Sequence, residues 1–224
     1  TWDVKGTTAD IMGQKIKISD VDANHYGEKK VNLKAQKGTV DKASGDVVLE
    51  KDVVITSDDG SQLTTDFLNW EKEKNTVSTD APVTLSDAKM TATGTGLKAQ
   101  SEMKSAQLEK NVTVKVDVSP DEKATQFVTI TCDGPMEIDQ RRNMATFNNN
   151  VVAEQQGRIL KADRAEIYFD QEKKQIRQLI CIGHVVIQQG ENVSYAERAV
   201  YNAGDQKITL SGQPKLILAV EEDG

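Results

Sequence analysis

Hydrophobic and polar residues alternate along most of this chain. Around Val47, Leu49, Val53 and Ile55 the apolar side chains all share one phase of a two-residue period. Further stretches of this kind end in clusters of Asp, Asn, Gly, Lys or Ser. A strand with this period has one dry and one wet face, which is typical of antiparallel sheets. The pattern therefore predicts an all-β chain of short antiparallel strands joined by polar turns.

Two sequence units recur along the chain. The segment LEKDVVI at 49–55 returns almost unchanged as LEKNVTV at 108–114. The second unit is an apolar residue, one spacer and a small residue. Its small residue falls at Ala35, Thr65, Thr93, Cys132, Ala162 and Ala196. The last three of these positions follow the first three at a nearly constant offset, so the repetition predicts two tandem modules.

We expect the modules to span residues 1–118 and 126–224, with a linker at 119–125. The polar run SPDEK indicates the linker, and Arg is absent from the first module but present in the second. Because each amphipathic strand must bury one face, stacked hairpins predict a jelly-roll-like, folded-sheet roll whose inner faces meet. The modules form either one continuous roll or two separate ones.

Composition narrows the function classes. Of the 224 residues, 37% are hydrophobic but only 4% are aromatic, so Val, Ile, Leu, Ala and Thr must fill the interior. The net charge of −7 argues against nucleic acid, which requires a basic face. An inner surface of small aliphatic side chains has two interpretations: a hydrophobic groove for acyl chains or an ordinary sandwich core. Periodicity alone favours the core.

No motif points to catalysis. Residues 94–99 match G-x-G-x-x-A, but the preceding residues are not the continuous apolar run of a buried parallel strand, so we do not expect a dinucleotide site. We interpret His25 as part of a solvated turn and His184 as an outward side chain on a strand. The carboxylate pairs lie in lysine-rich, turn-like contexts. The sequence therefore predicts no catalytic residue, no metal and no cofactor.

The two cysteines, Cys132 and Cys181, both occupy apolar-phase positions in neighbouring repeats of the second module. If their strands are neighbours, a disulfide between them is compatible with the geometry. The alternative is a pair of buried free thiols.

Longer segments resemble known proteins. Residues 17–26, 31–38 and 59–70 resemble the periplasmic lipopolysaccharide-export protein LptC, whereas residues 157–168 and 182–190 resemble the LptA/OstA-like domain. These resemblances imply a twisted antiparallel β-jelly-roll with an open hydrophobic seam. LptC and LptA are usually separate chains, so their tandem arrangement here suggests a natural fusion with a longer groove.

The resemblance also implies a non-enzymatic function in the periplasm. Family members pass lipopolysaccharide from an inner-membrane ABC transporter towards an outer-membrane translocon, and they stack end to end through edge strands, so head-to-tail self-assembly is a further expectation. LptC usually carries an N-terminal membrane helix. None is visible here, so we expect that such an anchor either precedes Thr1 or never existed. The alternatives are a structural β-repeat protein of the envelope without lipid cargo and a carbohydrate-active enzyme on a β-roll.

The apolar-phase residues are the candidate lining of a lipid groove. They are Leu49, Val53, Ile55, Leu63, Leu68, Trp70, Val83, Leu85, Leu108, Val112, Met136, Ile138, Phe147, Val151, Ile167, Ile176, Val185, Ile187, Leu210 and Leu216.

Overall fold

A computed structural model describes residues 2–26, 30–100, 105–118, 126–170 and 176–219. Within these ranges the regular elements are all β-strands, and they pair antiparallel, so the all-β antiparallel prediction is confirmed. The expected linker at 119–125 lies outside the described residues, and the module boundaries stay a prediction. No helix in the described ranges has the length and apolar character needed to cross a membrane.

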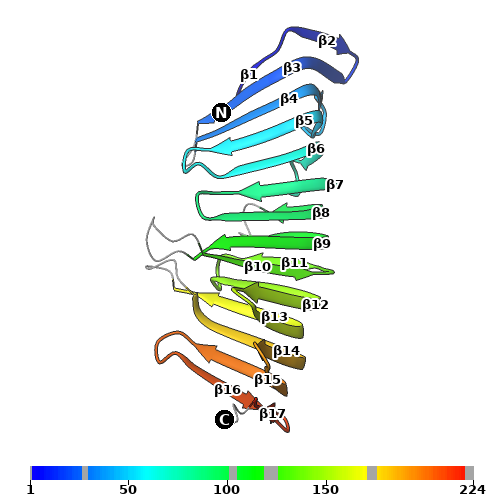
Figure 1. Ribbon diagram of the computed structural model, residues 1–224. Helices are drawn as coiled ribbons and strands as arrows, with labels where there is room; N and C mark the ends of the chain where they lie inside the picture. Colours follow the sequence, from blue (N-terminus) through cyan, green and yellow to red (C-terminus); the bar gives the residue numbers. More distant parts are fainter. Residues whose placement is uncertain (1, 27–29, 101–104, 119–125, 171–175, 220–224) are drawn as a thin grey trace. The chain divides into compact units, whose positions relative to one another are not determined.

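The chain divides into two compact units, Thr1–Glu109 and Lys110–Gly224, and the division falls inside strand β9 (Ser105–Asp117). The other strands of unit 1 follow in chain order in Figure 1: β1 (Trp2–Lys5), β2 (Thr8–Met12), β3 (Lys15–Tyr26), β4 (Lys30–Asp41), β5 (Val47–Ser57), β6 (Gln62–Glu71), β7 (Thr76–Ser86) and β8 (Met90–Gln100). Those of unit 2 are β10 (Phe127–Cys132), β11 (Met136–Asp139), β12 (Met144–Gln155), β13 (Arg158–Phe169), β14 (Ile176–Gln189), β15 (Asn192–Asn202), β16 (Lys207–Ser211) and β17 (Lys215–Ile217).

Within each unit the long strands form a meander in which each strand pairs with the next. In unit 1 this series runs from β3 to β8, and in unit 2 from β12 to β15. At the ends of these series, two short strands pair side by side along the length of one long strand. Strands β1 and β2 both pair with β3, β10 and β11 both pair with β12, and β16 and β17 both pair with β15. A pair of short strands therefore takes the place of one long strand that is interrupted in its middle.

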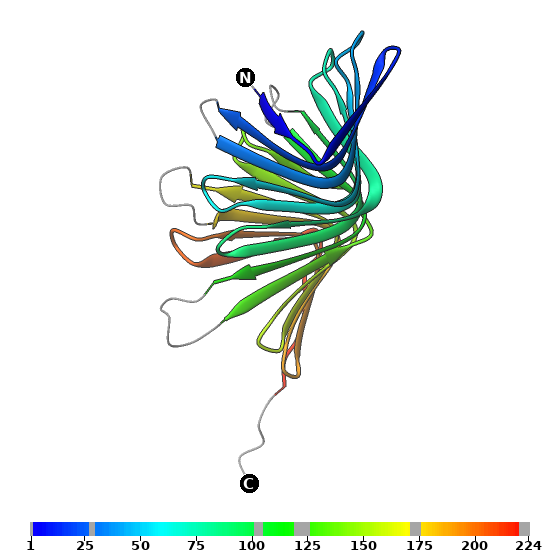
Figure 2. The ribbon, with the colours of Figure 1, turned by 90° about the horizontal axis from the view of Figure 1, so that it is seen from above.

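The long strands bend near their middle, as Figure 2 shows, and the pairing is irregular at the same level. The register shifts between Glu50 and Val53 where β5 meets β6, and between Asn148 and Val151 where β12 meets β13. Such bulges bend a strand and increase its twist. Each unit is therefore a folded sheet with two arms, which agrees with the expected folded-sheet roll.

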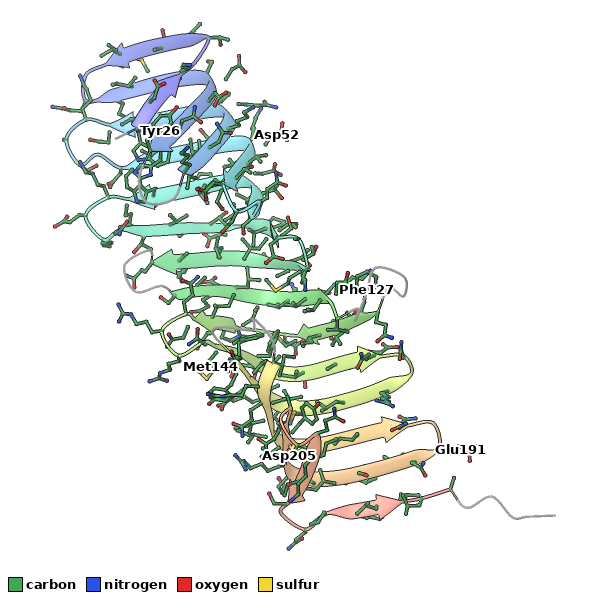
Figure 3. All side chains as sticks on the ribbon, turned by 90° about the vertical axis from the view of Figure 1, so that its left-hand side faces the viewer. Tyr26, Asp52, Phe127, Met144, Glu191 and Asp205 are labelled. Atoms are coloured by element: carbon green, nitrogen blue, oxygen red, sulfur yellow. The ribbon has the colours of Figure 1, made fainter. Side chains whose placement is uncertain are left out.

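The backbone at these bends enters the left-handed region. Asp52, which is labelled in Figure 3, has a φ value of 49°. Asn149 and Asn150 have φ values of 66° and 53°, and Gly183 has a φ value of 78°. Asn and Asp tolerate this conformation better than other side chains, and Gly has no Cβ to clash. The turn-like residues that interrupt the alternation in the sequence are thus the residues that allow the strands to bend.

The inside of each bend is the best-buried part of the units. On β5, β12 and β14, two buried residues are separated by three residues that are not buried, as Leu49 and Val53 are on β5. On β4, β13 and β15, two buried small residues flank two exposed ones. Most small residues of the sequence repeat lie at these places, namely Ala35, Thr65, Cys132, Ala162 and Ala196. Thr93 is the exception: it is exposed, and its neighbour Ala92 is buried instead.

We expect Val53→Ala to destabilise the protein because Val53 is 0% exposed at the bend of β5. Removing two buried methyl groups and leaving a cavity should lower the free energy of unfolding by about 2 kcal/mol. The control is Val54→Ala, which removes the same groups from the next, half-buried position of the strand. Chemical denaturation measures both variants, and equal losses would contradict the assignment of the core to the inside of the bend.

Candidate functional site

Half-buried apolar side chains line up across the strands on one arm of unit 1. The cross-strand register places Leu33 opposite Ile55, Ile55 opposite Leu63, and Leu63 opposite Leu85. Each of these side chains remains partly accessible to solvent. They form a continuous aliphatic row because directly paired residues of a sheet point to the same face.

A second apolar row runs along the other arm. Here Ile16 pairs with Val40, Val40 with Val47, Val47 with Trp70, and Trp70 with Val77. The buried residues of the bend lie between the two rows, and partly buried members of both rows pack against them. We call the two rows and the bend between them the inner face of the unit.

Unit 2 repeats this arrangement. One row consists of Ile130, Ala153, Leu160, Ile187, Ser194 and Leu216. The rows of the other arm are Met136, Phe147, Ala165, Cys181, Ala199 and Leu210, followed by Ile138, Ala145, Ile167, Leu179, Tyr201 and Ile208. Aliphatic side chains and alanines dominate these rows, so the inner face of unit 2 is apolar as well.

The structure separates the candidate lining residues by depth. The buried ones are Leu49, Val53, Leu68, Val83, Leu108, Val112, Met136, Phe147, Val151, Ile167 and Val185. The half-buried ones are Ile55, Leu63, Trp70, Leu85, Ile138, Ile187 and Leu210. Leu216 continues an inner row but is 57% exposed, because it lies on the short final strand. The buried set is core packing, and the half-buried set is the surface that a ligand could touch.

One candidate, Ile176, begins β14 and is 39% exposed. A register shift between Tyr168 and Phe169 pairs Ile176 with Phe169, which is 37% exposed, so Ile176 lies at an exposed strand end beyond Leu179. Sequence reasoning also left out several inner-face residues: Leu33, Val40, Val47, Val77, Leu160 and Leu179. Their alternation with polar neighbours was the signal that could have found them.

The two cysteines are free, buried thiols, so the structure lacks the disulfide that the sequence left open. Cys132 lies on β10 and Cys181 on β14, with β12 and β13 between them. Three strand spacings amount to about 14 Å, which is about twice the Cα separation that a disulfide can span. Burial raises the pKa of the Cys181 thiol to about 12, so this group is neutral and unreactive at neutral pH.

Polar pairs lie outside the inner face. His184 is exposed at the bend of β14, as expected, and its Nδ1 lies 2.8 Å from Asp163 Oδ2 on β13. This hydrogen bond and the negative charge of Asp163, with a smaller contribution from Glu197, raise the pKa of His184 above its ordinary value of 6.5. His25, by contrast, lies on strand β3 and not in the solvated turn that we expected, and its ring contacts that of Trp2 in a tilted arrangement with the ring centroids 5.0 Å apart.

Three features of the structure bear on the chemistry that the sequence could offer. Among the described residues, no three His, Cys, Asp or Glu side chains come close enough together to hold a metal ion. Residues 94–99, which mimic a dinucleotide motif, form part of strand β8. A hollow of about 450 Å³ lies between two exposed turns, around Asp46 and Lys72. Three of its charged side chains have partners, because Asp46 accepts a hydrogen bond from the Lys72 backbone and Lys74 pairs with Glu71.

Comparison with known proteins matches the chain to two families in succession. Residues 14–117 match a family described as lipopolysaccharide-assembly, LptC-related. Residues 129–222 match a family described as LptA/(LptD N-terminal domain) LPS transport protein. A search of the curated proteins finds no match.

Among solved structures, the chain is similar to LptH from Pseudomonas aeruginosa, which is described as the LptA-homologous periplasmic component of a lipopolysaccharide transport device. The identity is 12%, the match covers 85% of this chain and 95% of that one, and the TM-score is 0.25.

We expect His184 to titrate above pH 6.5 and Asp163→Asn to remove most of this upward shift. Because the pKa is higher in the folded than in the unfolded chain, the contact stabilises the fold below the ordinary pKa. This contribution is lost as the pH rises through the folded value. NMR titration of the His184 ring measures the shift. Glu197→Gln is the control, and it should change the pKa less than Asp163→Asn does because Glu197 makes no hydrogen bond to the ring. An unchanged pKa in Asp163→Asn would contradict the assignment.

Proposed function

Since the chain belongs to the LptC-related and LptA families of lipopolysaccharide transport proteins, with one domain of each in tandem, we propose that its inner faces carry the acyl chains of lipopolysaccharide. Proteins of these families are non-enzymatic components of the periplasmic transport bridge, and this chain is such a component. The finer step proposed here is that lipid A lies against the apolar rows while the saccharide stays in water.

The observation that carries this proposal is the partial exposure of the apolar rows. Leu33, Ile55, Leu63 and Leu85 form an unbroken aliphatic strip that remains accessible to solvent. The core residues Leu49 and Val53, by contrast, are 4% and 0% exposed. Each methylene of an acyl chain that leaves water against this strip contributes about 0.8 kcal/mol, so partial shielding of several chains is enough to hold the lipid.

The chemistry of the rows also suits a cargo that has to move on. Hydrophobic attraction has no preferred direction and scales with the area removed from water. A chain that slides along a uniform aliphatic row therefore exchanges one contact for a similar one and breaks no hydrogen bond. Such exchange of similar contacts suits a protein that passes its lipid on rather than one that binds it permanently.

We propose the edge strands of the units as the places where partners attach. Ile11 and Met12 on β2, and Leu216 and Ile217 on β17, are large apolar residues that remain exposed. Strand addition satisfies the free backbone groups of an edge, and the exposed side chains add specificity. The partners expected there are other jelly-roll bridge proteins, a further copy of this chain, the inner-membrane ABC transporter and the outer-membrane translocon.

A photo-crosslinking experiment tests the lipid proposal. We expect a photoreactive amino acid at Ile55 or Ile187 to form adducts with lipopolysaccharide, because both positions are half-buried in the inner rows. The matched controls are Lys51 and Lys161, which are exposed. Adducts are detected by gel shift and immunoblotting against lipopolysaccharide.

The outcomes separate the two functions that remain. Adducts at the inner positions alone would support the lipid path. Equal labelling of Lys51 and Ile55, or no adduct at any inner position, would contradict it and favour a structural envelope protein without lipid cargo.

A further inference from the structure

The only two tryptophans of the chain, Trp2 and Trp70, touch each other. Their ring centroids are 6.5 Å apart, and the planes are tilted by 47°. Trp2 also contacts His25, with ring centroids 5.0 Å apart and planes tilted by 48°. These separations are typical of attractive aromatic pairs. The three rings therefore form one cluster, which we call the aromatic clasp.

The clasp joins residues that are far apart within the sheet. Trp2 pairs with His25 on β3. Trp70 lies in the second apolar row, and the member of that row on β3 is Ile16. Ile16 and His25 are nine positions apart (25 − 16), which corresponds to about 30 Å along a strand at about 3.3 Å per residue. The two rings are nevertheless in contact, so the contact crosses the space between the two arms of unit 1.

The part of the clasp on β1 is weakly held. All four residues of β1 are exposed, and Trp2 itself is 40% exposed. The strand is paired with β3 over four residues, and Gly6 follows it directly. An exposed four-residue edge strand has little buried area to hold it in place. Movement of this strand would separate Trp2 from Trp70 without disturbing the core.

The opposite half of the clasp belongs to the inner face. Trp70 is half-buried, and its neighbours in the row are Val47 and Val77. Both valines pack against the buried core of unit 1. Trp70 is therefore fixed by the sheet, whereas Trp2 is the part that can move.

We propose that the aromatic clasp controls the access of acyl chains to the inner face of unit 1. This inference depends on the proposed function, since it assumes that acyl chains lie against these rows. With the rings in contact, the two arms are linked across the inner face. An acyl chain that occupies the face beneath the rings has to displace Trp2 from Trp70.

Spectroscopy can follow the clasp directly, because both tryptophans of the chain belong to it. Two indole rings in contact give an exciton-coupled circular dichroism band, which Trp2→Phe and Trp70→Phe should each abolish. We expect purified lipopolysaccharide to reduce this band in the full chain as binding saturates. A band that stays unchanged while lipopolysaccharide forms adducts at Ile55 would overturn the proposal.

The rate of lipid capture provides the second test. In Trp2→Ala, we expect lipopolysaccharide adducts at Ile55 to form at least threefold faster, while the rate at Ile187 in unit 2 stays the same. Phe127→Ala is the matched control, because Phe127 is a similarly exposed aromatic residue in unit 2. Trp2→Phe retains a ring and should lie between the natural chain and Trp2→Ala.

The outcomes distinguish the clasp from the function on which it depends. An equal or slower rate at Ile55 in Trp2→Ala would overturn the clasp, and a slower rate would identify Trp2 as a ligand contact instead. The absence of adducts at both Ile55 and Ile187 in every variant, including Trp2→Ala, would overturn the proposed function and the clasp with it, whereas adducts at Ile187 without any at Ile55 would overturn the clasp alone. Capture by Trp2→Ala but not by the natural chain would support both.

Discussion

A long β-strand can bend sharply only where its ladder of hydrogen bonds is interrupted, and in both units the interruptions fall at the same level of neighbouring strands. This alignment lets the strands fold over together, with a row of buried residues such as Val53 and Thr65 on the inside. Asp52 and Asn150 adopt a left-handed backbone conformation at the bend, which costs conformational free energy. The burial of apolar side chains on the inside of the bend offsets this cost. The apolar rows on the two arms exist as surfaces because the bend brings them to face the same interior.

The bend also explains the unusual composition. Where the arms converge, small residues such as Ala162 and Ala165 lie beside larger ones, and the single large ring buried there among the described residues, Phe147, pairs directly with Ala165. Farther out on the arms, Val, Leu and Ile are long enough to form a continuous apolar surface but too small to close it completely. The aliphatic residues fill most of this surface, and two of the few aromatic residues, Trp2 and Trp70, contact each other.

Much of this architecture could be predicted from the sequence, because alternation survives wherever a strand is straight. Leu33, Ile55, Leu63 and Leu85 share one phase of the alternation in the sequence, and they form one row on a straight arm. The errors fall where local pattern carries no information. The alternation does not reveal the register shift that precedes the pairing of Ile176 with Phe169. The disulfide could be judged only once the intervening strands β12 and β13 were known. The contact of Trp2 with Trp70 depends on folding over, which no periodicity encodes.

The replacement of one long strand by two short ones, seen at β1 and β2 and again at β16 and β17, has a consequence for how such units can vary. Within a unit, the position of the bend sets the cross-section, whereas the number of hairpins sets the length. These two properties are independent, because each strand contacts mainly its neighbours in sequence. Duplication or loss of a hairpin would lengthen or shorten the unit by a fixed step and leave its cross-section unchanged. In this architecture, the length of a unit can therefore change during evolution while the cross-section of its inner face stays the same.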